Sequence, residues 1–210
     1  MQFTLPDKQQ IARVPTPIEP LNQLSKEWGV DLRIKRDDLT GTELSGNKIR
    51  KLDFLLHEEI IQGCDTVVTC GAVTSNHARA TALAARKLGL DCVLVLAGKK
   101  PETLNTNLQL NLLCGAEIRY ISWEEYGPVI DDYIEDVGND LRKKGKKPYV
   151  IPTGGSNAMG LVGYVDAVRE IKSQCEASGW FPEITVCAVG SGGTYAGICL
   201  GNQMEPFCED

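Results

Sequence analysis

The chain has 210 residues, 42% apolar and 24% charged, a balance typical of a globular protein able to bury its own core. A formal net charge of −6 disfavours a nucleic-acid partner, and no apolar run approaches the roughly 20 residues that span a bilayer. The eight cysteines form no Cys-x-x-Cys pair, so we expect reduced thiols, no metal and a cytoplasmic location.

The first 50 residues do not show the alternation of strand and helix patterns found later in the chain. Their start lacks the basic region and apolar run of a secretory signal. Prolines make residues 11–18 extended, whereas residues 21–28 fit a short helix and residues 31–36 fit a strand.

From about residue 64 onward, short β-branched runs alternate with helical periodicity. The predicted strands are 66–69, 92–96, 116–121, 148–151 and 184–189, and the predicted helices are 76–88, 103–113, 128–144 and 159–176. Because the strands are continuous apolar runs, we expect an α/β fold whose parallel sheet is covered on both faces by crossover helices. We interpret 52–150 as a small α/β domain and assign 1–51 and 151–210 to a second, larger domain.

The first segment that carries chemistry is Ser45-Gly46-Asn47-Lys48-Ile49-Arg50-Lys51-Leu52. Gly46 permits a tight turn, and Lys48 would lie at the start of the following helix. The helix dipole and the nearby Arg50 and Lys51 would lower the pKa of Lys48, which suits an amine that attacks an aldehyde. Taken alone, the segment favours the plainer alternative of a surface lysine in a basic helix turn.

The second segment follows the strand at 66–69 and contains Ser75-Asn76-His77. Ser75 is a good N-cap for the predicted helix at 76–88. Asn76 and His77 would then lie in its first turn, where exposed backbone N–H groups attract an anion such as a substrate carboxylate. Simple capping with a structural histidine is an equal alternative.

The third segment is Gly190-Ser191-Gly192-Gly193-Thr194, between an apolar run and an expected helix. Its glycines permit close backbone approach and its hydroxyls donate, so it predicts a phosphate cradle. It is neither a Walker A sequence nor a good dinucleotide fingerprint. A glycine-rich turn without a ligand stays open, and Gly154-Gly155-Ser156-Asn157 is a similar but weaker case.

Together the three segments would suit a phosphorylated aldehyde cofactor that is joined to a lysine and holds a carboxylated substrate. In order, residues 36–52, 75–77, 149–157 and 190–197 resemble the 1-aminocyclopropane-1-carboxylate deaminase/D-cysteine desulfhydrase family. That family belongs to the tryptophan synthase β-like, fold-type II pyridoxal phosphate enzymes. The resemblance covers about residues 10–201 and implies a two-domain, parallel-sheet architecture.

The resemblance implies a role for each matched residue. Lys48 would form a Schiff base with pyridoxal 5'-phosphate, and Lys51 would assist its phosphate. Asn76 would bind the cofactor's phenolic oxygen. Ser75, Asn76 and His77 would bind the substrate, with Ser75 also a candidate nucleophile or proton shuttle. The implied phosphate loop consists of Ser191, Gly192, Gly193 and Thr194.

The implied reaction is α,β-elimination on D-cysteine, giving pyruvate, hydrogen sulfide and ammonia, with Lys48 removing the Cα proton. Deamination of 1-aminocyclopropane-1-carboxylate is the alternative. The resemblance favours D-cysteine over it, because deaminases tend to carry Ser-Asn-Gln where this chain has Ser75-Asn76-His77. The expected partner is a small amino-acid substrate, with neither nucleic acid nor membrane, and the resemblance suggests a homodimer.

The family's chains continue well past the point where this sequence stops. We therefore expect a truncated chain with a complete small domain and an incomplete larger domain, which makes catalysis by this chain alone doubtful. A catalytically inactive isoform that binds cofactor or a partner is a second hypothesis. Without the resemblance, a Rossmann-like nucleotide-binding module is a third.

Overall fold

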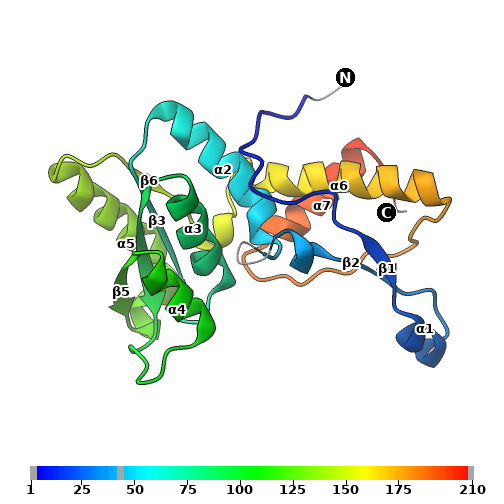
Figure 1. The fold of residues 1–210 in the computed structure, drawn as a ribbon, viewed down its shortest axis with the longest axis horizontal. Coiled ribbons are helices and arrows are strands. Elements are labelled where there is room, and N and C mark those ends of the chain that lie inside the picture. Colours follow the sequence, from blue (N-terminus) through cyan, green and yellow to red (C-terminus); the bar gives the residue numbers. More distant parts are fainter. Residues whose placement is uncertain (1–3, 42–44, 208–210) are drawn as a thin grey trace.

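The structure, a computed structural model, describes residues 4–41 and 45–207, apart from the side chains of 58–62 and 128. In Figure 1 a parallel sheet with its helices occupies one side of the molecule. Helices α6 and α7 and the N-terminal strands occupy the other, and α2 lies between the two sides. None of the helices described is both long and apolar enough to cross a membrane.

The parallel sheet has the strand order β5-β4-β3-β6. Its strands are β3 (Thr66–Ala72), β4 (Asp91–Ala97), β5 (Glu117–Ile121) and β6 (Pro148–Val150). Successive side chains enter opposite cores, because Val67 and Leu94 pack on one face while Val68 and Val93 pack on the other. The double-sided burial and the strands predicted at 66–69, 92–96, 116–121 and 148–151 are confirmed.

Helices cover both faces of this sheet. α3 (Asn76–Lys87) and α4 (Thr106–Leu113) share the core that contains Val67, whereas α5 (Trp123–Lys143) packs on the opposite core. Side chains fix the start of each helix: Ser75 caps α3, Asn105 caps α4 and Ser122 forms a capping box at α5. Helices α3 and α5 therefore begin close behind the strand that precedes each of them.

The N-terminal flank forms a small antiparallel unit. β1 (Ile18–Pro20) pairs with β2 (Arg33–Lys35), and α1 (Asn22–Trp28) connects them. The 3-10 helix η1 (Asp37–Leu39) follows and leads toward α2 (Lys48–Gln62). The predicted helix at 21–28 and strand at 31–36 are confirmed. Helix α2 continues through the expected domain boundary at 51/52, and that boundary stays a prediction.

After β6, the 3-10 helix η2 (Thr153–Gly155) leads to α6 (Ala158–Ser178), and α7 (Gly193–Met204) follows later in the chain. Glycines let α2, α6 and α7 pack closely. A Cβ on Gly163 of α6 would lie 2.3 Å from the carbonyl oxygen of Arg50 in α2. A Cβ on Gly197 of α7 would lie 2.5 Å from the Cβ of Tyr164 in α6. These close approaches bring the start of α7 near the start of α2.

Residues 184–189 form no strand, which corrects the strand predicted there. Ile184, Val186 and Val189 are 79%, 88% and 62% exposed. A strand needs a neighbour for its backbone N–H and C=O groups, and none of the described strands pairs with this segment. Apolar, β-branched composition therefore indicated a tendency toward extended structure, but it could not supply the pairing partner.

Candidate functional site

Lys51 lies in the first turn of α2 and is 1% exposed. Its ammonium donates to the carbonyl oxygen of Gly154 and to the hydroxyl of Ser156, both at 3.1 Å. Burial, together with the nearby Lys48 ammonium, lowers the pKa of Lys51 to about 8. A cation is therefore buried here beside a second one, with uncharged groups as its partners.

Lys48 is the first residue of α2 and is partly buried. Burial lowers the pKa of its ammonium, in the direction predicted from the sequence. The expected contribution of Arg50 is wrong, because that guanidinium faces Asp37 and Glu170 instead. Within the described residues, no carboxylate pairs with Lys48 or Lys51.

The loop before α7 reaches the partners of Lys51. The hydroxyl of Ser191 lies 2.8 Å from that of Ser156, the group that Lys51 also contacts. A Cβ on Gly193 would lie 2.4 Å from Ser156 Oγ and 2.6 Å from Lys51 Nζ, so any larger residue here would displace these two groups. The loop and the first turn of α2 thus meet at one point.

The start of α7 is also bound to the segment before α2. Asn47 Nδ2 donates to Thr194 Oγ1 at 3.1 Å. Gly192 precedes α7 in the left-handed region, with φ of 84°, and no described side chain caps the helix. The first backbone N–H groups of α7 can therefore face an anion beside Lys51.

A second glycine loop, which the sequence analysis gave as a weaker case without assigning it a role, completes this group. Gly154 has φ of 68°, and a Cβ there would lie 2.3 Å from Ser191 Oγ. Ser156 contacts both Lys51 and Ser191. The signal was the Gly-Gly-Ser-Asn sequence after a strand, which resembles the predicted phosphate loop but looked weaker by itself.

The predicted turn after β3 begins α3. Ser75 Oγ accepts from the backbone N–H of Ala78 at 3.1 Å, so the predicted cap is confirmed. A Cβ on Gly71 would lie 2.4 Å from Ser75 Oγ, so the strand must turn tightly into the helix. Asn76 is exposed, and its Oδ1 accepts from Asn107 Nδ2 of α4 at 2.9 Å.

His77 is 4% exposed, and its Nε2 lies 2.9 Å from the hydroxyl of Thr69. That hydroxyl donates its proton to the carbonyl oxygen of Ile151 at 2.8 Å, so His77 Nε2 must carry the ring proton. Burial, with Lys48 and Lys51 nearby, lowers the pKa of His77 to about 3. His77 is therefore neutral, and its Nδ1 is an acceptor without a partner among the described residues.

The arrangement divides the expected site residues into two groups. Lys51 and the loop of Ser191, Gly192, Gly193 and Thr194 meet around Ser156, with Lys48 one helical turn before Lys51. Ser75, Asn76 and His77 lie at the start of α3, where the His77 ring borders Gly155 of the second glycine loop. The first group suits a phosphate-sized anion, because its donors converge and its buried cations lack a described carboxylate.

Comparison with known proteins gives one family and several close relatives. The family model described as "Pyridoxal-phosphate dependent enzyme" matches residues 10–206. A "Putative 1-aminocyclopropane-1-carboxylate deaminase" of Pyrococcus abyssi is 50% identical over 90% of this chain and 56% of its own length. A "Bifunctional D-cysteine desulfhydrase/1-aminocyclopropane-1-carboxylate deaminase, mitochondrial" of Arabidopsis thaliana is 46% identical over 92% and 50%. A "D-cysteine desulfhydrase" of Klebsiella pneumoniae is 39% identical over 95% and 62%.

Solved structures agree on the fold. An "ACC deaminase homologue" superposes with a TM-score of 0.87 at 45% identity, covering 96% of this chain and 60% of its own. An L-serine ammonia-lyase from Rhizomucor miehei has a TM-score of 0.69 at 22% identity, covering 90% and 55%, and supports the fold alone. The expected fold-type II α/β architecture is confirmed for the part that the chain covers. The chain spans between 50% and 62% of the length of these curated relatives.

Proposed function

The chain belongs to the family of pyridoxal-phosphate dependent enzymes, and from this premise we propose that it binds pyridoxal 5'-phosphate at Lys48 and acts on a small amino acid. The reaction would be a lyase or deaminase reaction. The first candidate is α,β-elimination on D-cysteine, which gives pyruvate, hydrogen sulfide and ammonia. The observation that carries the proposal is that buried Lys51, one turn after Lys48, donates to one glycine loop and lies so near Gly193 of the other that an added Cβ there would clash with it.

The group around Lys51 fits the cofactor's phosphate. The Lys51 ammonium, the hydroxyls of Ser156 and Ser191 and the backbone at the start of α7 form the donor set that a phosphate needs. Glycine at position 193 keeps this space clear, because a Cβ added there would lie 2.6 Å from Lys51 Nζ. A bound dianion would also offset the cost of burying two lysines close together.

Lys48 would act as both the cofactor's anchor and the base. Burial lowers the pKa of its ammonium, which increases the fraction of neutral amine near neutral pH. A neutral amine can attack the cofactor's aldehyde and can later accept the proton from the substrate's Cα. Pyridoxal phosphate, when bound, supplies that aldehyde and a ring that takes up the charge left at Cα.

The start of α3 would receive the substrate's carboxylate through the backbone N–H groups of its first turn. The Ser75 hydroxyl caps α3 as an acceptor, so its own proton stays available for transfer. The contact of Asn76 with Asn107 uses Asn76 Oδ1, which leaves the amide nitrogen to donate to the cofactor's phenolic oxygen. A neutral His77 would add no positive charge beside the two lysines.

Two activities compete as the specific function. The Klebsiella pneumoniae relative and the sequence Ser75-Asn76-His77 favour D-cysteine. The Pyrococcus abyssi relative favours deamination of 1-aminocyclopropane-1-carboxylate, and the name of the Arabidopsis relative combines both. The family match disfavours the nucleotide-binding module, and none of the comparisons favours the inactive isoform.

Cofactor binding is tested by visible absorption. Purified protein that has been incubated with pyridoxal phosphate and then freed of unbound cofactor should show an absorption band near the visible edge. Lys48→Ala should abolish this band, whereas Lys143→Ala, at an exposed lysine of α5, should retain it. A wild-type protein that stays colourless with added cofactor would contradict the proposal.

The substrate is tested by product analysis on the same preparations. Release of pyruvate, sulfide and ammonia from D-cysteine should exceed that from L-cysteine. Ammonia release from 1-aminocyclopropane-1-carboxylate, measured in parallel, tests the alternative. If turnover of the cyclopropane substrate is higher, that substrate replaces D-cysteine as the first candidate.

We also propose a cytoplasmic location and a homodimeric state. No disulfide joins the cysteines that the structure describes, which supports a reducing compartment. Fluorescence imaging of the tagged chain would test the location, and a mitochondrial pattern would match the name of the Arabidopsis relative instead. Sedimentation would test the dimer, because a mass near 22.9 kDa would indicate a monomer.

A further inference from the structure

Arg50 lies between Lys48 and Lys51 in α2, and the proposed chemistry gives it no role. Positions in a helix are about 100° apart, so the two lysines share one face and Arg50 points elsewhere. Arg50 is 3% exposed. It donates to both carboxylate oxygens of Asp37, at 2.9 and 2.8 Å, and to both of Glu170, at 2.9 Å each. Two bidentate pairs fix both the position and the plane of the guanidinium.

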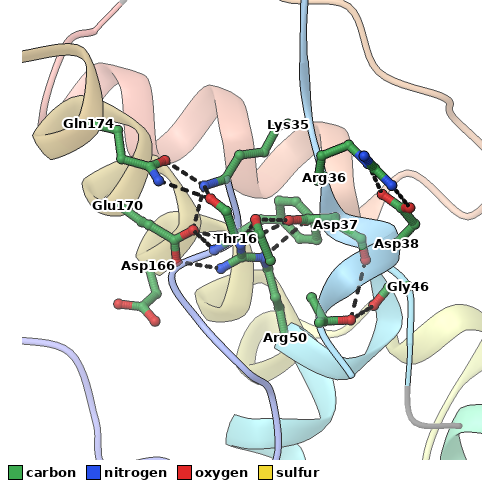
Figure 2. A network of polar contacts seen from close by, with 12 residues as sticks. Thr16, Lys35, Arg36, Asp37, Asp38, Gly46, Arg50, Asp166, Glu170 and Gln174 are labelled. Atoms are coloured by element: carbon green, nitrogen blue, oxygen red, sulfur yellow. Dashed lines mark hydrogen bonds and ion pairs between the residues drawn. The ribbon is translucent and has the colours of Figure 1, made fainter. Parts of the chain in front are cut away.

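The partners of Arg50 are themselves held in place, as Figure 2 shows. Thr16 Oγ1 donates to Asp37 at 2.9 Å, and Lys35 donates to Glu170. The two cations Arg50 and Lys35 thus meet two carboxylates, and the charges balance. We call this cluster the Arg50 network, and its members are Thr16, Lys35, Asp37, Arg50, Glu170 and Gln174.

The backbone at the start of α2 is held by neighbours of the same network. Thr40, which follows η1, donates its hydroxyl to the carbonyl oxygen of Gly46 at 3.1 Å. On α6, Gly163 packs so closely that its Cβ would lie 2.3 Å from the carbonyl oxygen of Arg50. The turn that presents Lys48 is therefore fixed from the Arg50 side.

We propose that Arg50 is a positioning residue, which sets the rotation of α2 about its axis and so holds Lys48 and Lys51 where the cofactor's aldehyde and phosphate require them. The inference rests on the proposed function. A helix with its side chains has a radius of about 5–6 Å, so a rotation of about 10° moves a side-chain tip by about 1 Å. A displacement of about 1 Å at a reacting group can cost about 100-fold in rate. Because Asp37 and Glu170 neutralise Arg50, it acts through position rather than charge.

The test compares Arg50→Lys with Arg36→Lys in the full chain. Lysine keeps the charge but cannot form two bidentate pairs. Arg36 is the matched control, because it pairs with Asp38 at 2.7 Å on the exposed side of η1. Titration of the visible band gives the cofactor's affinity, a pH series gives the midpoint at which the band changes, and urea unfolding gives stability.

Arg50→Lys should lower the affinity for pyridoxal phosphate by about tenfold or more, a loss comparable with that seen when groups that orient a site are removed. It should also shift the pH midpoint of the band. Arg36→Lys should match the wild type. A lower urea midpoint with unchanged affinity and pH midpoint would show a merely structural role and overturn the inference. Equal changes in both variants would also overturn it.

Two further outcomes keep the inference separable from the proposed function. If Arg50→Lys does not fold, Asp37→Asn gives the same comparison, since it leaves the Glu170 pairing in place. A wild-type chain without any band contradicts the proposed function and this inference with it. A normal wild-type band that persists unchanged in the folded variant contradicts this inference alone.

Discussion

The first turn of α2 separates two regions that handle buried charge in opposite ways. In the Arg50 network, each buried cation meets a carboxylate. In the lysine region, the buried Lys51 ammonium has a hydroxyl and a carbonyl oxygen as partners and Lys48 is partly buried, and no carboxylate among the described residues pairs with either lysine. The first region is complete as folded, whereas in the proposed function a ligand completes the second.

The pKa values follow this difference. Burial alone would raise the pKa of Glu170, but hydrogen bonds from Arg50 and Lys35 outweigh it and lower the pKa to about 2. For Lys51, burial and the neighbouring Lys48 both lower the pKa, to about 8. The network therefore stabilises the charged forms of Glu170 and Arg50, although burial lowers the pKa of Lys35, and the lysine region destabilises its own charges.

The sharpest way to break this comparison is to remove one cation from each region. Arg50→Met should lower the free energy of unfolding by about 4 kcal/mol, because Asp37 and Glu170 lose their common partner inside the protein. Lys51→Met should leave the ligand-free protein as stable as before or more so, because it removes a buried cation that has no carboxylate partner. Urea unfolding of both variants measures the contrast, and equal losses would erase the distinction.

A fall in pH should remove the stabilisation that Glu170 gives to the Arg50 network. The pKa of Glu170 falls from 4.5 to about 2 on folding, so the folded chain favours the charged carboxylate more than the unfolded chain does. Its stabilisation is present above about pH 4.5 and is lost as the pH falls toward 2, by about 3 kcal/mol. Urea unfolding should show that the wild type loses its advantage over Glu170→Gln in this window. An advantage that did not change with pH would contradict the assignment.

The sequence predicted the lysine region better than the network. Lys48, Lys51 and the loop at 190–194 stand in short segments whose glycines, hydroxyls and cations point to chemistry even before the fold is known. The members of the network come from residues 16, 35, 37, 50, 170 and 174, and each alone is an ordinary polar residue. Only the packing of the N-terminal flank, α2 and α6 brings them together, so no local pattern could indicate them. The roles assigned to the site residues stay predictions.

Two sequence predictions failed for related reasons. Arg50 was expected to lower the pKa of Lys48, because closeness in sequence was taken for closeness in space, whereas the helix turns the guanidinium toward Asp37. The strand at 184–189 was inferred from β-branched composition, which cannot tell whether a pairing partner is present. Both depend on contacts between distant segments.

A rise in pH should stabilise the ligand-free protein through Lys51. The pKa of Lys51 falls from 10.5 to about 8 on folding, so the cost of burying its charge is incurred in full below about pH 8. As the pH rises further, the folded chain releases this proton first, and the ligand-free protein should gain about 2 kcal/mol by about pH 9.5. Lys51→Met should lack this gain in urea unfolding. A wild type that does not gain relative to the variant would show that Lys51 is compensated after all.

The smallest effect on stability should come from Gly193→Ala. Its Cβ would lie 2.4 Å from Ser156 Oγ and 2.6 Å from Lys51 Nζ, two flexible side-chain ends that can move aside, so we expect a loss of about 1 kcal/mol. The same movement spreads the donor set, so the thermal stabilisation by inorganic phosphate should largely disappear. Gly127→Ala in α5, where nothing lies within 4 Å of the added Cβ, is the matched control and should keep it. If Gly193→Ala responds to phosphate like the wild type, the anion does not sit at the start of α7, and the two buried lysines would lack the ligand that distinguishes their region from the Arg50 network.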